Sequence, residues 1–204
     1  MVVKLDDQKR QAIGEKLADM KAVQNLIISN EQALIRLCPD QDVRDRLQNM
    51  ISDDQKNLGV LDTVIVQYGI PAQPHKTTQK FIQQAEQMMG SNELSFYQKL
   101  VQHELLKHGQ VMSGLLVHKA AQVVGADIEV AIAPLNTINF ENRAHQEQLK
   151  GMLELVGVRE LTGKDADQGL WARVQDAVAA LSGVAGSVIT QNSDKQDMNI
   201  QTVI

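Results

Sequence analysis

The chain has 204 residues, of which 43% are hydrophobic, 22% are charged and only 3% are aromatic. The few aromatic residues and the few prolines favour helices packed on helices over β-sheets. The net charge of −5 argues against a nucleic-acid partner, because such proteins display a surplus of Lys and Arg on one face. A single cysteine, no apolar run of about 18 residues and no signal-peptide pattern indicate a cytoplasmic protein that spans no membrane.

Two long helices are predicted for the first third of the chain. The first runs from about Asp6 or Asp7 to Leu37, and the second runs from about Asp40 to Tyr68. The short connection between them makes the two helices antiparallel neighbours.

The rest of the chain is expected to add a crossover and two further long helices. Residues 77–89 form a shorter helix that carries the chain from one end of a bundle to the other. The third long helix is capped by residues 91–93 and ends near Gly125. Residues 127–133 are helical, Pro134 either kinks this helix or starts a new one, and the helix ends near Leu155. The domain prediction is a helical bundle over residues 1–162, an accessory C-terminal helix over 163–182 and a flexible tail over 183–204.

Helical spacing places several polar residues on the faces predicted to point inward. These are Gln24 and Glu31 on the first helix, Asp54 and Asn57 on the second, Glu104, His108 and His118 on the third, and Asn142 and His145, with Glu141 alongside, on the fourth. A buried ionised Glu costs several kcal/mol unless it is paired, hydrogen-bonded or bound to a metal. Each such residue therefore needs a partner from another helix, although an isolated Glu31 near its helix end could also turn toward solvent.

This pattern resembles the ferritin-like di-iron carboxylate proteins, in which two helices each supply one Glu and two others each supply a Glu-x-x-His pair. Glu31 and Glu104 match the single-Glu positions. Asp54-x-x-Asn57 and Asn142-x-x-His145 fall at the positions of the pairs, but each pair has an Asn in place of a ligand.

A closer resemblance is to cyanobacterial proteins labelled hemerythrin-like or HHE cation-binding. The segments 102–122 and 139–163 are similar to segments of those proteins that precede a separate hemerythrin-like region. This chain has five His residues and no His-x-x-x-Glu pair, so an oxygen-binding hemerythrin site would lie outside it.

The resemblance implies an all-α, ferritin-like four-helix bundle with a crossover helix and an additional C-terminal helix. It also implies a metal-binding function in iron handling or oxidative-stress protection, with iron or manganese as the ion and zinc as a poorer match. The expected ligands are Glu31, Asp54, Glu104, His108, Glu141 and His145. The alternative is a metal-free polar core in a structural, ligand-holding or adaptor bundle. A homodimer is compatible with the sequence, and no motif assigns a reaction.

Overall fold

The computed structural model describes residues 7–166, and every regular element in that range is an α-helix, as the sequence predicts. The helices are α1 (Asp7–Leu37), α2 (Gln41–Tyr68), α3 (Lys76–Gly90), α4 (Phe96–Val124), α5 (Ala126–Ile132) and α6 (Leu135–Thr162). Nearly all of the predicted accessory helix, and the whole of the predicted tail, lie outside the described residues. No helix in the described range is long and apolar enough to cross a membrane.

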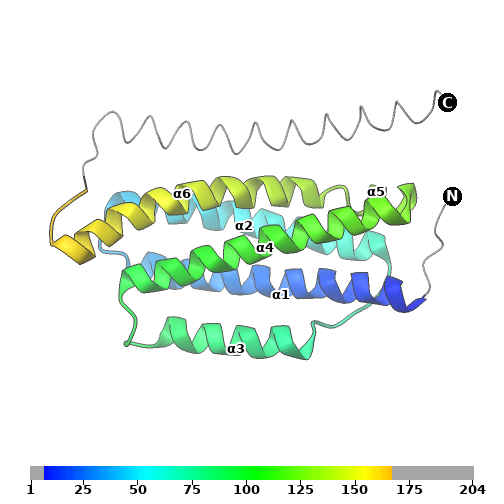
Figure 1. Ribbon diagram of the computed structural model, residues 1–204, viewed down its shortest axis with the longest axis horizontal. Helices are drawn as coiled ribbons and strands as arrows, with labels where there is room; N and C mark the ends of the chain where they lie inside the picture. The colour runs from blue at the N-terminus through cyan, green and yellow to red at the C-terminus, as the bar shows by residue number, and fades with distance from the viewer. Residues whose placement is uncertain (1–6, 167–204) are drawn as a thin grey trace, which may run out of the picture.

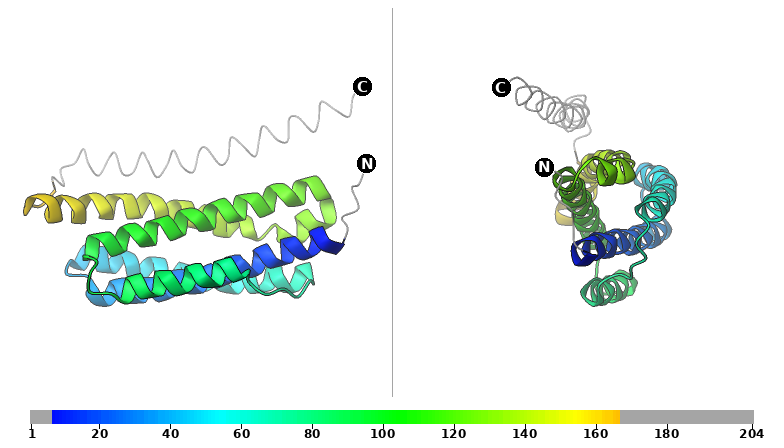
Figure 2. Two further views of the ribbon diagram at one scale, coloured as in Figure 1. Left: turned by 60° about the horizontal axis from the view of Figure 1, so that its bottom comes forward. Right: turned by 90° about the vertical axis from the view of Figure 1, so that its right-hand side faces the viewer.

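The four long helices lie side by side, and α3 lies outside them against α1 (Figures 1 and 2). Going round the group, α1 packs on α2, α2 on α6, α6 on α4, and α4 on α1. Helix α3 carries the chain back along the outside, so α4 starts at the end of the molecule where α2 starts (Figure 1). The predicted crossover segment therefore exists.

The ends of the first helices follow ordinary capping chemistry. The Asp40 side chain accepts a hydrogen bond from the backbone N–H of Val43, so Asp40 caps α2. Gly69 ends α2 with φ of 74°, a left-handed conformation that glycine adopts without strain. Helix α4 is capped by Ser95 and Gln98, which form a reciprocal capping box. The predicted cap at residues 91–93 is thus a few residues too early.

Helix α6 runs past the end that was predicted near Leu155. Gly157, a residue type that often ends a helix, lies inside α6. A Cβ at this position would lie 2.8 Å from the Tyr97 ring, so the glycine allows α6 to approach α4 closely. The helix ends instead at Gly163, with φ of 68°. Pro134 precedes the first residue of α6 and starts a new helix, one of the two predicted outcomes.

Two apolar clusters fill the ends of the group of long helices. Leu17, Leu61 and Ile138 belong to the cluster at one end, and Leu34, Leu47 and Leu149 belong to the cluster at the other. Buried polar side chains occupy the level between the clusters. The fold thus places a group of buried polar side chains between the two apolar clusters.

The inward faces predicted for α1, α2 and α6 agree with the structure, but the face predicted for α4 is wrong. On α2 the predicted Asp54 and Asn57 are buried on one face with the apolar residues Val43, Leu47, Met50, Leu61, Val64 and Tyr68. On α4 the buried face instead includes Leu100, His103, Lys107, Gln110, Gly114, Val117 and Ala121. This row also has helical spacing, and it lies about 100° round the helix from the predicted row.

Candidate functional site

The four long helices each contribute to one buried group, which we call the polar centre. It consists of Glu31 from α1, Asp54 from α2, His103 and Lys107 from α4, and His145 from α6. Each of these residues is at most 3% exposed. Their side chains therefore interact with one another and with the surrounding helices rather than with solvent.

Lys107 is the hub of the polar centre. Its Nζ donates to the Asp54 carboxylate and to His145 Nδ1, the latter at 3.0 Å. Glu31 Oε1 lies 3.4 Å from the same nitrogen, and His103 Nε2 lies 3.2 Å from Glu31 Oε1. An ammonium therefore sits among the acidic and imidazole groups that the sequence suggested as metal ligands.

Two glutamines extend the polar centre toward the end where α1 begins. Gln110 Nε2 donates to Gln24 Oε1 at 3.2 Å, and Gln24 Nε2 donates to Asp54 Oδ1 at 2.9 Å. Gln110 also donates to the backbone carbonyl of Met20 at 2.9 Å. These bonds keep Asp54 hydrogen-bonded on both oxygens, as a buried carboxylate requires.

Burial decides the charge state of most members of the polar centre. Burial raises the pKa of Glu31 to about 9, helped by the neighbouring Asp54 charge and opposed by Lys107. Burial would also raise the pKa of Asp54, but the Lys107 charge and hydrogen bonds from Glu31 and Lys107 lower it to about 2. Near neutral pH, Glu31 is protonated and Asp54 is the carboxylate that balances Lys107.

The two histidines of the polar centre are neutral near pH 7. Burial lowers the pKa of His103 to about 3, and the Lys107 charge lowers it further in the same direction. Burial, again with Lys107, lowers the pKa of His145 to about 4. The polar centre thus holds one ion pair and three neutral titratable groups.

Glu104 and His108 lie outside the polar centre, in a second group on the surface between α4 and α6. Gln146 Nε2 donates to Glu104 Oε1 at 3.1 Å and lies 3.0 Å from His108 Nδ1. Glu104 is half-buried and His108 is exposed. We call these three residues the surface triad.

The structure places five of the six expected metal ligands in these two groups and leaves Glu141 outside both. Glu31, Asp54 and His145 belong to the polar centre, while Glu104 and His108 belong to the surface triad. Glu141 is half-buried, and one of its carboxylate oxygens has no hydrogen-bond partner among residues 7–166. Within this range no three His, Cys, Asp or Glu side chains are placed so that they could hold one metal ion.

Sequence reasoning missed Lys107 and His103. A lysine in the middle of a helix is normally solvated, so it was not assigned to an inward face. The signal was present, because Glu31 and Asp54 are on inward faces and need a positive partner. The row from Leu100 through His103, Lys107 and Gln110 has the same helical spacing as the predicted row through Glu104 and His108.

The chain is similar to a protein from Nostoc sp. (strain PCC 7120) that is named "DNA nickase". The two are 62% identical over all 204 residues of this chain. The chain spans 58% of the length of that relative. No protein-family model matches the chain, and no solved structure matches it.

This relative corrects several expectations from the sequence. It is named for an action on DNA and not as a ferritin-like or hemerythrin-like protein, which overturns the resemblance and the iron-handling function that the resemblance implied. The name of the relative implies a nucleic-acid partner, which contradicts the expected absence of a nucleic-acid partner and the expected metal-ion partner. Net charge misled because it averages over the whole chain and does not describe one face of it.

Proposed function

We propose that this chain acts on DNA and cuts one of its strands. The observation that carries the proposal is the 62% identity, over the full length of the chain, to the relative named DNA nickase. Identity that extends from the first residue to the last covers surface as well as core positions, so it supports a shared activity and not only a shared fold.

The polar centre is not where DNA would be cut. Asp54 and Lys107 have no exposed side-chain surface, and a phosphodiester has to touch the groups that act on it. We assign the polar centre to holding the four long helices in one arrangement, a role that buried polar networks play in other proteins.

We propose the surface triad as the acid–base group of the cutting reaction. His108 is exposed, and a histidine is the side chain used most often to accept or donate a proton near neutral pH. Gln146 connects it to Glu104, so all three side chains are held in one place. In this reaction a water molecule would attack the phosphorus and give its proton to His108 Nδ1, which would release the hydrogen bond from Gln146, while the departing sugar oxygen would take a proton from solvent as its P–O bond breaks.

The test is the conversion of supercoiled plasmid to the open-circular form by the purified 204-residue chain. We expect open circles to accumulate before linear DNA, because cutting one strand removes the supercoils. His108→Gln should slow this conversion by about a hundredfold or more, the usual contribution of a general base. A plasmid that stays supercoiled with the wild-type chain would contradict the proposal.

His118→Gln is the matched control. His118 is on the same helix and also lies next to a glutamine, with 3.1 Å between its Nε2 and Gln122 Nε2. The His118→Gln variant should cut plasmid at the wild-type rate if the surface triad is the group that acts on DNA. Equal losses in the two variants would show that the histidine at position 108 has no special role.

We further propose that the connectivity of the helices is that of a ferritin-like four-helix bundle. Its support is the long crossover through α3, which makes α2 and α4 parallel (Figure 1). This proposal concerns the path of the chain alone.

A further inference from the structure

A groove of about 330 Å³ lies between α1, α3 and α4. It exists because α3 packs on α1 and stands away from α4, outside the four long helices (Figure 2). The start of α3 is fixed to α1 by His75, whose backbone N–H and ring Nδ1 meet the Asp19 carboxylate at 2.8 and 2.9 Å. Ala85 and Met89 bury the inner face of α3. The walls of the groove are therefore held in place.

The groove combines an aromatic wall with hydroxyl groups and a cation. Phe81 from α3 is 46% exposed and Leu105 from α4 is 55% exposed, so both present apolar surface at the groove. Thr77, Thr78 and Ser113 contribute hydroxyl groups and Lys16 contributes an ammonium. Asp19 also lines the groove, and its carboxylate is bound by His75. An aromatic face next to hydrogen-bonding groups and one positive charge fits a nucleotide, which has a flat base and an anionic phosphate.

Gly109 keeps the groove open. It lies in the middle of α4 and lines the groove, and a Cβ built on it would meet no atom within 4 Å. A glycine inside a helix costs about 1 kcal/mol relative to alanine. No packed neighbour excludes a side chain at position 109, so a larger residue there would fill part of the groove.

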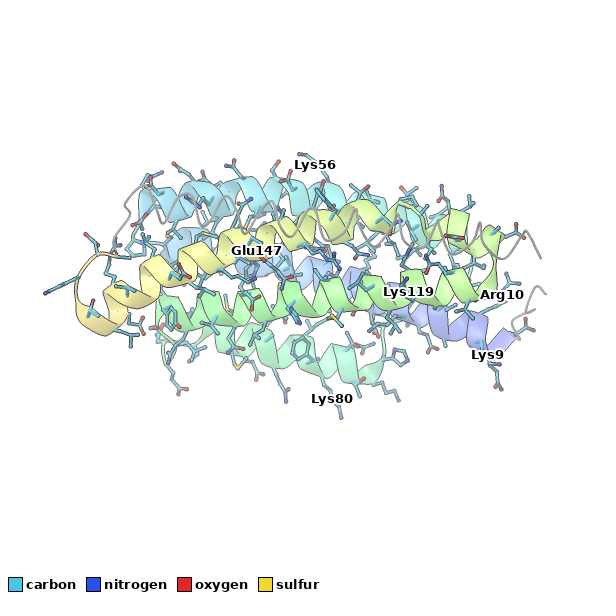
Figure 3. The ribbon with its side chains drawn as sticks, turned by 45° about the horizontal axis from the view of Figure 1, so that its top comes forward. Lys9, Arg10, Lys56, Lys80, Lys119 and Glu147 are labelled. Carbon is cyan, nitrogen blue, oxygen red and sulfur yellow. The ribbon has the colours of Figure 1, made fainter. Side chains whose placement is uncertain are left out.

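Basic side chains lie on all three helices that form the groove, toward one end of the molecule. Lys9 and Arg10 lie on the first turns of α1, Lys76 and Lys80 on the first turns of α3, and Lys119 near the end of α4. Helices α1 and α3 begin at the end of the molecule where α4 stops (Figure 1), and Lys9, Arg10 and Lys119 appear at that end in Figure 3. Acidic residues such as Asp7 and Asp127 lie at the same end, so these basic side chains offer separate contacts to phosphates and not a continuous basic surface.

We infer that the groove between α1, α3 and α4 binds an unpaired nucleotide of the DNA on which the chain acts, with its base against Phe81. A duplex is too wide to enter a space of this size, so the occupant is a single-stranded segment or a nucleotide displaced from its pair. The inference rests on the proposed function, because it names the form of DNA that the chain holds. Glu104 and His108 directly precede Leu105 and Gly109, so the surface triad lies about 100° round α4 from the groove.

The experiment measures the affinity of the 204-residue chain for a fluorescent oligothymidylate of about 12 nucleotides by anisotropy, next to a blunt duplex that has no unpaired base. The wild-type chain should bind the single strand more tightly. Phe81→Ala should raise its dissociation constant about tenfold, the typical loss when one stacked base is released. Gly109→Leu, which fills the groove, should have an effect of similar size.

Gly59→Leu is the matched control. Gly59 lies inside α2, is exposed, and has no atom within 4 Å of a built Cβ, as for Gly109. This variant should change the dissociation constant by no more than about twofold, as for an ordinary surface substitution. Circular dichroism of each variant checks that the helices are intact.

The results separate this inference from the proposed function. If the wild-type chain nicks plasmid while Phe81→Ala and Gly109→Leu bind the single strand as the wild type does, the groove is not the binding site and the proposed function stands. If the wild-type chain prefers the blunt duplex, the inference is overturned as well. If single-strand binding depends on Phe81 and Gly109 but plasmid is never cut, the groove inference holds and the cutting proposal fails.

Discussion

Replacing Lys107 with methionine tests the structural role of the polar centre most directly. The change keeps most of the side-chain volume but leaves the Asp54 carboxylate buried without its cation. Because Glu31 is already protonated, a single buried charge is left unpaired, and removing one partner of such a pair costs about 3–5 kcal/mol. With a urea m-value of about 2–3 kcal/mol/M, the midpoint of unfolding should fall by roughly 1–2.5 M.

The double variant Lys107→Met with Asp54→Asn is the internal check on this reasoning. Its polar centre has no charge to desolvate, and the Asn carbonyl can still accept the hydrogen bond that Gln24 donates to Asp54. We expect it to recover most of the lost stability, measured as the urea midpoint by circular dichroism. A single variant within about 1 kcal/mol of wild type, or a double variant no more stable than the single one, would refute the ion-pair account.

The stability of the single variant Lys107→Met should depend on pH differently from that of the wild type. In the wild type the pKa of Asp54 is lowered to about 2, so its contribution to stability is present above the ordinary value of 3.8 and is lost as the pH falls toward 2. Without Lys107, burial raises the pKa of Asp54 instead. The gap in stability between wild type and Lys107→Met should therefore narrow as the pH falls below that raised pKa.

Burial raises the pKa of Glu31 from 4.5 to about 9, so between these pH values Glu31 is protonated in the folded chain and ionised in the unfolded chain. The stability of wild type relative to Glu31→Gln should therefore fall as the pH rises from about 4.5 to about 9. Urea unfolding at several pH values measures this difference. Gly157→Ala should lower the unfolding midpoint by the equivalent of about 1–3 kcal/mol, because its Cβ meets the Tyr97 ring at 2.8 Å, whereas Gly59→Ala should raise stability by up to about 1 kcal/mol. His75→Ala should speed amide hydrogen exchange at the start of α3 without changing exchange in the long helices, since it removes the ring contacts to α1; unchanged exchange in α3 would contradict that role.

The sequence predicts this fold well where apolar and polar residues separate cleanly around a helix. On α2 every predicted inward residue is buried, because Leu47, Leu61 and their neighbours leave one row for the core. On α4 the pattern fails, because the predicted row through Glu104 and His108 also carries apolar residues such as Val111. Hydrophobic spacing cannot choose between two such rows, and only the partners on the neighbouring helices decide.

The candidate site was harder to predict for a different reason. A sequence shows that buried carboxylates need a positive partner, but it does not show whether that partner is an ion or a lysine. Lys107 supplies the charge from within the chain, and the residue type that usually marks a solvated face stands here at the centre. The function class could not come from spacing either, because helix patterns describe packing and the proposed DNA contacts depend on how surface residues of three helices meet.

The glycine-to-ring contact between Gly157 and Tyr97 also bears on how the chain assembles. It joins the last turns of α6 to the first turns of α4, while Lys107 and Asp54 join α4 to α2 half-way along. Sliding α4 by one helical turn, about 5.4 Å, would break both contacts together and leave the lysine among apolar side chains. The two contacts together fix the register of α2, α4 and α6 along their common axis. A partly assembled chain with α4 out of place gains little stability until both contacts form.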